Sequence, residues 1–174
     1  MKVYRTDEIR NVVLLGHGGS GKTSLAEAML YVSGAVSRMG KISESNTTSD
    51  FDKEEQKREF SIHTTLYPIE WEKAKINILD TPGHQDFSED TYRTLMAADS
   101  AVMVIDGSKG VEAQTRKLFK VCVMRHIPIL HLSTKWTETQ TIPLIFWMRS
   151  KRNWELRPAL LTGLLVPEKI PRRL

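Results

Sequence analysis

The sequence predicts an α/β domain in which a mostly parallel β-sheet is flanked by helices. Strand-like and helix-like segments alternate along the first 130 residues, as in folds built from β-α-β units. A glycine-rich loop joins the first strand to the first helix, and residues 101–105 are continuously apolar, which is typical of a parallel strand covered on both faces. With 174 residues the chain can build one hydrophobic core, so we expect a single compact unit.

The elements follow in chain order from the spacing of apolar residues. Residues 11–15 form a short apolar run and predict the first strand, whereas residues 21–33 carry apolar side chains on one helical face. Residues 34–61 lose this periodicity and predict a long loop before a second strand at 62–71. A third strand is expected at 75–79, where apolar and polar residues alternate, and a helix at 86–98.

The same alternation continues into the second half of the chain. After the strand at 101–105, residues 111–124 predict a helix, and residues 127–130 begin one more strand. No comparable pattern follows, so the sheet is expected to be incomplete at its C-terminal side. We therefore expect a domain in residues 1–130 and a separate tail in residues 131–174.

The single cysteine and the N-terminus indicate the cellular setting. Cys122 cannot form an internal disulfide and lies among apolar residues, so we expect a buried core thiol. The first 11 residues are charged and lack the apolar stretch of a signal peptide, and the apolar run near 160–166 is too short to span a bilayer. We expect a cytoplasmic protein without a membrane or DNA partner, monomeric if folded.

Residues 16–23 satisfy the phosphate-binding pattern G-x-x-x-x-G-K-[ST] between a predicted strand and a predicted helix. Glycines let consecutive backbone N–H groups surround phosphate oxygens at the helix N-terminus, where the helix dipole favours anions. Lys22 is expected to reach the β- and γ-phosphates and Thr23 to ligate Mg²⁺. A glycine turn without a ligand is the alternative. The expected nucleotide-binding residues of this P-loop are Gly16, His17, Gly18, Gly19, Ser20, Gly21, Lys22 and Thr23.

The segment Asp80-Thr81-Pro82-Gly83-His84 follows the strand at 75–79 and looks like the second half of the phosphate site. An aspartate at the C-terminal end of a strand can hold a magnesium-bound water, and a glycine N–H can bind the γ-phosphate. Asp-x-x-Gly alone also describes an ordinary turn, but its place one loop and two strands after the P-loop favours the functional interpretation. These five residues are expected to contact the nucleotide, with Asp80 also at the metal.

Over residues 1 to about 130 the chain resembles translational GTPases of the elongation factor G and release factor 3 branch. GHGGSGKTSL and SDFDKEE are closer to elongation factor G, whereas HQDFSEDTYRTLMAADSAVMVID, which begins at His84, is similar to release factor 3. The resemblance implies ribosome-triggered hydrolysis of GTP with Mg²⁺. It also implies that His84 is the catalytic residue that positions the attacking water; a solvated loop histidine is the alternative.

The first switch of this family carries Arg-Gly-Ile-[Thr/Ser], whose hydroxyl closes onto Mg²⁺. The corresponding segment here is Arg58-Glu59-Phe60-Ser61, which keeps the hydroxyl but replaces the flexible glycine. The resemblance therefore implies that Ser61 joins Thr23 and Asp80 as a metal ligand. A plain loop serine is the alternative.

The family's guanine-recognition motif, Asn-Lys-x-Asp, is absent after the strand at 127–130. Ser133-Thr134-Lys135-Trp136 takes its place and has no carboxylate for the base. Trp136 has the codon TGG and the codon of Thr137 begins with AC, so a frame that starts one base before the Thr137 codon reads GAC, which encodes Asp. If Ser133 is encoded by TCA and Thr134 by ACA, the same shifted frame reads Asn-Lys-[Met/Val]-Asp. Our hypothesis is a single-base deletion near Ile129, after which residues of about 130–174 are translated out of frame.

The tail, residues 131–174, differs in composition from the rest. It carries a net charge of +5 against −1 for residues 1–130, and it holds three of the four Trp and four of the seven Pro, as a shifted frame would explain. A basic arm that binds ribosomal RNA and a solvated tail without a partner are the alternatives. The alternative to a GTP-hydrolysing translation factor is a truncated, catalytically inactive P-loop fragment with weak, base-unselective nucleotide binding.

Overall fold

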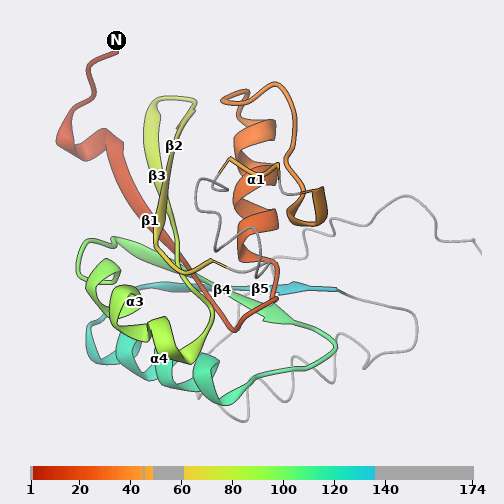
Figure 1. Cartoon of the computed structure of the whole chain (residues 1–174). Helices are drawn as coiled ribbons and strands as arrows, with labels where there is room; N and C mark the ends of the chain where they lie inside the picture. The colour runs from red at the N-terminus through yellow and green to blue at the C-terminus, as the bar shows by residue number, and fades with distance from the viewer. Residues whose placement is uncertain (1, 45, 49–60, 136–174) are drawn as a thin grey trace, which may run out of the picture. The chain divides into compact units, whose positions relative to one another are not determined.

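The computed structural model describes residues 2–44, 46–48 and 61–135 (Figure 1). The chain divides into two units, Met1–Thr141 and Ile142–Leu174, and the second lies outside the described residues. The strands described in the first unit are β1 (Ile9–Leu15), β2 (Thr65–Trp71), β3 (Ala74–Asp80), β4 (Ser100–Asp106) and β5 (Ile129–Thr134). The α-helices described are α1 (Lys22–Val32), α3 (Ser88–Thr94) and α4 (Ala113–Met124), and short 3-10 turns lie at Thr6–Glu8, Ile42–Glu44 and Gln85–Phe87.

The strands form one sheet in the order β2-β3-β1-β4-β5. The β1–β3, β1–β4 and β4–β5 pairs are parallel, and β2 is antiparallel to β3. The predicted mostly parallel sheet is thereby confirmed. The last strand, β5, was predicted to begin within 127–130, and it continues beyond Leu130 to Thr134. It does so because β4 pairs with it as far as Asp106, which lies opposite Thr134.

Helices lie on both faces of the sheet, with α1 on one side and α3 and α4 on the other (Figure 1). The α1 side of the core is a cluster of buried apolar residues from α1 and four strands: Leu14, Ala26, Leu30, Tyr67, Ile69, Ile78, Val102 and Val104. Removing these side chains from water is the main stabilising term of such a layer. On α4, Cys122 is fully buried, as expected, and burial raises the pKa of its thiol to about 11.

The helix predicted at 86–98 is shorter in the structure. A 3-10 turn at Gln85–Phe87 precedes α3, which ends at Thr94. The residues after Thr94 form hydrogen bonds with β1 instead of continuing the helix. The Asn11 backbone N–H donates to Asp99 Oδ2 at 2.7 Å, and the Asn11 side chain donates to Ala97 O at 2.9 Å. A tertiary contact therefore ends the helix before its apolar pattern does.

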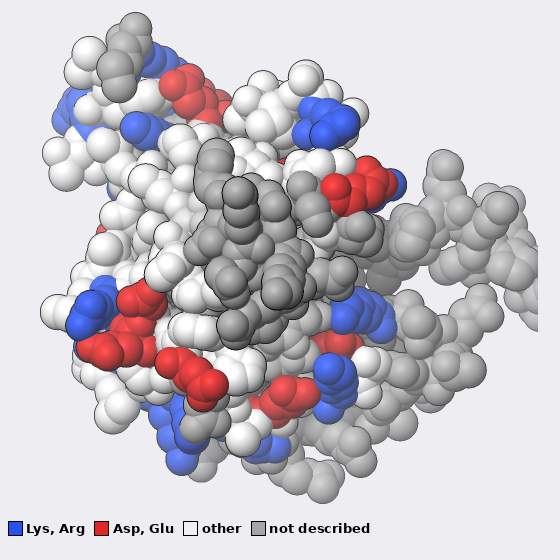
Figure 2. All heavy atoms as spheres, viewed as in Figure 1, with Lys and Arg blue, Asp and Glu red and all other residues white. Residues whose placement is uncertain are grey.

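The described residues show no single-sign charge patch on the face viewed in Figure 2, where basic and acidic side chains are interspersed. Most of the basic excess of the sequence lies in 136–174, outside the described residues. Within the part of the chain that the structure describes, every helix is too short or too polar to cross a bilayer.

Candidate nucleotide-binding site

The P-loop connects the end of β1 at Leu15 to the start of α1 at Lys22. Gly16, Gly19 and Gly21 have positive φ values of 149°, 74° and 94°, which glycine adopts without strain. The loop is tightened by a hydrogen bond from the Ser20 N–H to His17 O at 3.2 Å. The chain thus wraps into a compact turn directly before the positive end of the α1 dipole, a geometry that favours an anion.

Lys22 lies inside this turn rather than in solvent. Its ammonium group is buried and donates hydrogen bonds to Gly16 O at 3.2 Å and His17 O at 3.0 Å. Burial lowers the pKa of Lys22, and the negative charge of Asp80 opposes this effect. An ammonium group held by two neutral carbonyls keeps a strong preference for an anionic partner, such as a phosphate.

Thr23, Asp80 and Ser61 meet beside Lys22, although they lie far apart in the sequence. The Thr23 hydroxyl donates to Asp80 Oδ2 at 2.6 Å, and Ser61 Oγ lies 3.3 Å from Thr23 Oγ1. Asp80 is 1% exposed. Two hydroxyls and one carboxylate form an all-oxygen donor set, which is the chemistry that Mg²⁺ prefers. The three residues named as metal ligands in the sequence therefore come together in a set that fits Mg²⁺.

The turn after β3 is held against the P-loop. The Thr81 hydroxyl donates to Leu14 O at 2.7 Å, and the Thr91 hydroxyl donates to Pro82 O at 3.4 Å. A methyl group added to Gly83 would lie 2.5 Å from Lys22 Nζ and 2.6 Å from the Gly18 backbone nitrogen. Only glycine lets the backbone approach the P-loop this closely.

His84 follows Gly83 and is half exposed. Its Nδ1 lies 3.4 Å from Asp86 Oδ2 and accepts a hydrogen bond of 3.4 Å from the Asp86 N–H. Its ring centroid lies 6.1 Å from that of Phe87. These contacts join His84 to the neighbouring residues of its own turn, directly after Gly83.

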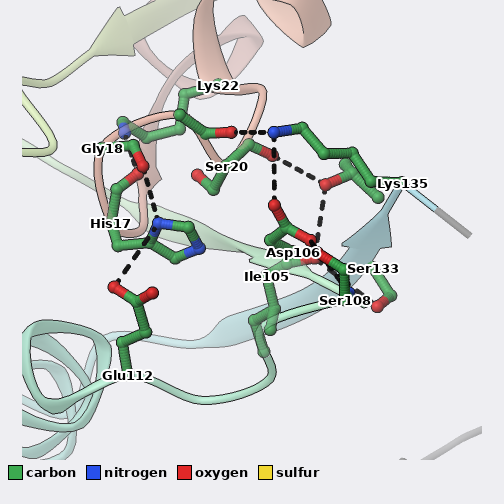
Figure 3. Close-up of polar contacts among 12 residues, drawn as sticks. His17, Gly18, Ser20, Lys22, Ile105, Asp106, Ser108, Glu112, Ser133 and Lys135 are labelled. Atoms are coloured by element: carbon green, nitrogen blue, oxygen red, sulfur yellow. Dashed lines mark hydrogen bonds and ion pairs between the residues drawn. The ribbon is translucent and has the colours of Figure 1, made fainter. Parts of the chain in front are cut away.

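Residues at the end of β5 support the P-loop from the side, a contact that the sequence did not predict (Figure 3). Lys135 Nζ donates to Gly19 O at 2.5 Å, and the Thr134 hydroxyl donates to Ser20 O at 2.7 Å. Lys135 Nζ also lies 3.2 Å from Asp106 Oδ2. The signal in the sequence is positional, because β4 and β5 are parallel and their C-terminal ends lie at the edge where open α/β sheets bind ligands.

Asp106 is buried at the end of β4 and carries the charge that Lys135 meets. Burial alone would raise the pKa of Asp106, but hydrogen bonds from Ser108 (N–H at 2.9 Å) and Lys135 outweigh it and hold the pKa at about 2. The carboxylate therefore stays charged at neutral pH and fixes Lys135 beside the P-loop.

His17 connects the P-loop to α4, a second contact missed in the sequence (Figure 3). The imidazole is buried, and its Nδ1 donates to Gly18 O at 2.7 Å and lies 3.6 Å from Glu112 Oε2. Glu112 is the residue that precedes α4. The P-loop is therefore held by side chains from the start of α4 and from the end of β5.

A strand, an anion-binding glycine loop and a helix, with an Asp-x-x-Gly turn at the end of the neighbouring parallel strand, define a P-loop nucleotide-binding domain. The sequence profile of the Elongation factor Tu GTP binding domain matches residues 7–143. The chain belongs to this family of GTP-binding domains.

Among individual proteins, the chain is similar to peptide chain release factor 3. The Staphylococcus aureus and Staphylococcus epidermidis proteins of this name are each 52% identical to it over 130 residues. The alignment covers 72% of this chain and 25% of each relative, so the chain spans about a quarter of the length of the curated relatives it matches.

Solved structures show the same fold. A crystal structure of a Thermus thermophilus protein matches with a TM-score of 0.79 at 31% identity, over 83% of this chain and 22% of the other. Translation elongation factor SelB from Methanococcus maripaludis, solved in complex with the GTP analogue GppNHp, matches with a TM-score of 0.56 at 21% identity, over 78% and 23%. The second likeness supports the fold alone.

Proposed function

We propose that this chain binds GTP with Mg²⁺ and hydrolyses its γ-phosphate as the G domain of a ribosome-associated factor of the release factor 3 type, acting in the cytoplasm. The observation that carries the proposal is the meeting of Thr23, Asp80 and Ser61 beside the buried Lys22. The 52% identity to release factor 3 favours this branch over elongation factor G.

In this proposal the P-loop recognises phosphate. Backbone N–H groups of residues 18–23 and the α1 N-terminus face the α- and β-phosphates, and Lys22 supplies the countercharge at the β- and γ-phosphates. The Gly83 N–H, whose close approach to Gly18 and Lys22 requires glycine, donates to the γ-phosphate. Catalysis by such a site consists of positioning and electrostatic stabilisation rather than covalent chemistry.

The metal and the water complete the proposed site. Thr23, Ser61 and Asp80 would hold Mg²⁺, which neutralises charge on the phosphate oxygens when bound. His84 orders the attacking water, and it must turn from Asp86 towards Gly83 to do so. Binding to the ribosome is the proposed trigger for that change, by resemblance to the family.

A second candidate function is nucleotide binding without selectivity for guanine. Thr134 and Lys135, at the end of β5, contact P-loop carbonyls, and residues 133–135 contain no carboxylate. A chain with this arrangement would recognise the phosphates of a nucleotide but not its base. We further propose, from the composition of residues 131–174 and the codon argument, that this tail is out of frame and that the native G domain continues in the shifted frame.

Phosphate release in single-turnover conditions, with the 174-residue chain in excess over GTP, tests the proposed function. Ribosomes should accelerate release, and His84→Ala should slow the stimulated rate by about a hundredfold or more while GTP affinity is unchanged. His126→Asn, at an exposed position after α4, serves as the control and should behave like the wild type. Binding without any hydrolysis would support the second candidate, and equal rates for His84→Ala and the wild type would contradict the role of His84.

A further inference from the structure

Helix α1 carries a buried carboxylate that the proposed chemistry does not use. Glu27 is 1% exposed and lies four residues after Thr23, a spacing that places both side chains on the same face of the helix. A buried carboxylate is tolerated when hydrogen-bond donors surround it. The partners of Glu27 therefore indicate its role.

Three hydrogen bonds to Glu27 come from one segment, residues 40–48. The Gly40 N–H donates to Oε2 at 3.1 Å, and the Thr48 N–H donates to Oε1 at 2.6 Å. The Thr48 hydroxyl also donates to Oε2 at 3.3 Å. Both ends of the segment thus meet one carboxylate on α1.

Between these two ends the segment folds on itself. The Lys41 N–H donates to Asn46 Oδ1 at 2.7 Å, and the Glu44 N–H donates to Lys41 O at 3.1 Å in the 3-10 turn Ile42–Glu44. Lys41 Nζ pairs with Glu44 Oε1 at 2.8 Å. The described residues of this segment, 40–44 and 46–48, are therefore linked to one another by hydrogen bonds, and the Glu27 carboxylate joins the two ends.

The contact between Gly40 and Glu27 is close enough to exclude a side chain. A Cβ added to Gly40 would lie 2.7 Å from Glu27 Oε2 and 2.6 Å from Thr47 Cα. These distances are shorter than van der Waals contact, so any larger residue must shift the Glu27 carboxylate or the backbone of the loop.

The same face of α1 meets the chain again at Ser61, whose Oγ lies 3.3 Å from Thr23 Oγ1. Thr23 and Glu27 are separated by four residues, roughly 6 Å along a helix axis. Residues 48 and 61 are thus held about one helical turn apart on one helix, and the residues between them, 49–60, lie outside the described part of the chain.

We propose that Glu27 is a positioning residue, which anchors residues 40–48 on α1 and thereby places Ser61 beside Thr23 at the Mg²⁺ site. This inference rests on the proposed GTP-binding function. Its physical reason is loop closure, because the entropic cost of bringing Ser61 to Thr23 is lower when the chain is already fixed on α1 at Thr48, 13 positions before Ser61, than when it is fixed only at the end of α1.

Hydrogen exchange of the full chain, without added nucleotide, tests the anchor. In Glu27→Gln, which keeps the shape of the side chain but removes its charge, the Gly40 and Thr48 amides should exchange at least about tenfold faster than in the wild type. Glu72→Gln makes the same charge change at an exposed position between β2 and β3, outside this loop, and should leave both amides at the wild-type rate. Unchanged exchange in Glu27→Gln would overturn the proposal.

The positioning role is tested by the Mg²⁺ dependence of GTP affinity. Glu27→Gln should raise the Mg²⁺ concentration for half-maximal GTP binding by about tenfold and leave the affinity in EDTA unchanged, whereas Glu72→Gln should change neither. Faster amide exchange with an unaltered Mg²⁺ dependence would mean that Glu27 holds the loop but does not position Ser61 at the metal site, and this result would overturn the proposal. If the wild-type chain binds no GTP, the proposed function and the metal-site role both fall, and the exchange result alone decides whether Glu27 anchors the loop.

A second variant breaks the same contact from the loop, in case Glu27→Gln does not fold. Gly40→Ala introduces the Cβ that meets Glu27 Oε2 and leaves α1 intact. It should reproduce the faster exchange of the Thr48 amide and the higher Mg²⁺ requirement. Wild-type behaviour in a folded Gly40→Ala chain would overturn the proposal equally.

Discussion

The buried aspartate at the end of β4 gives the most quantitative prediction. The pKa of Asp106 lies at about 2, below its ordinary value of 3.8, and the difference corresponds to about 2 kcal/mol at about 1.4 kcal/mol for each pKa unit. Because the pKa is depressed in the folded state, this stabilisation is present above pH 3.8 and is lost as the pH falls through about 2. Asp106→Asn should therefore destabilise the chain at pH 7 by about 2 kcal/mol.

The assay is urea unfolding followed by circular dichroism at a series of pH values from 7 down to 2.5. The difference in unfolding free energy between the wild type and Asp106→Asn should shrink steadily below pH 4, because the carboxyl group of Asp106 becomes protonated in the unfolded state there, whereas in the folded state its pKa is about 2. Asp7→Asn, at an exposed position, should show no such difference. An Asp106→Asn difference that is equal at pH 7 and pH 2.5 would refute the assignment of this charge.

Three further predictions follow from the site. Gly83→Ala should lower GTP affinity at least about tenfold, because its methyl group meets Lys22 Nζ and the Gly18 nitrogen. Gly110→Asn is the control, because a Cβ at Gly110 meets nothing within 4 Å. Equal GTP affinities of Gly83→Ala and the wild type would contradict the close approach of Gly83 to the P-loop. Without a carboxylate that binds the guanine base, the chain lacks roughly 3 to 6 kcal/mol of binding free energy for guanine. GTP and ATP should therefore compete almost equally for the site. A hundredfold preference for GTP would show that another group binds the base. Sequencing the gene around codon 129 should reveal a run of T, and restoring one T there should open a downstream frame that reads Asn-Lys-[Met/Val]-Asp and continues into further domains. An unbroken frame without such a run in independent isolates would exclude the deletion.

The parts of the site that the sequence predicted are those whose chemistry lies in consecutive residues. The P-loop needs glycines, a lysine and a hydroxyl at a fixed spacing, so residues 16–23 were recognisable without a structure. The Asp80–His84 turn was recognisable because it follows a strand at the expected distance from the P-loop. The alternation of strands and helices likewise predicted the sheet and its covering helices.

The missed contacts are those made by residues far apart in the chain. The Thr134 hydroxyl reaches Ser20 O across 114 positions and Lys135 reaches Gly19 O across 116. No local pattern distinguishes such residues from an ordinary strand end. Glu27 was missed for a similar reason, because a single glutamate on a helix usually faces solvent, and only the packing of Gly40 and Thr48 reveals its burial.

Helix α3 illustrates the limit of periodicity for element boundaries. Its apolar pattern continues to residue 98, but the backbone leaves the helix at Thr94 because Ala97 and Asp99 bond to Asn11 on β1. The extension of β5 to Thr134 has the same origin, since β4 supplies its partners. Tertiary hydrogen bonds decide such ends, and local propensity does not record them.

Recognition of nucleotide phosphates by Lys22 and the P-loop around it is the core of the proposed function. Titration calorimetry of Mg²⁺·GTP with the wild type and Lys22→Ala tests it most directly, with Lys120→Ala, an exposed lysine of α4, as the control. We expect the wild type and Lys120→Ala to bind with equal affinity and Lys22→Ala to show no measurable binding, because the phosphates lose their main countercharge. Undiminished affinity in a folded Lys22→Ala chain would contradict the proposed recognition.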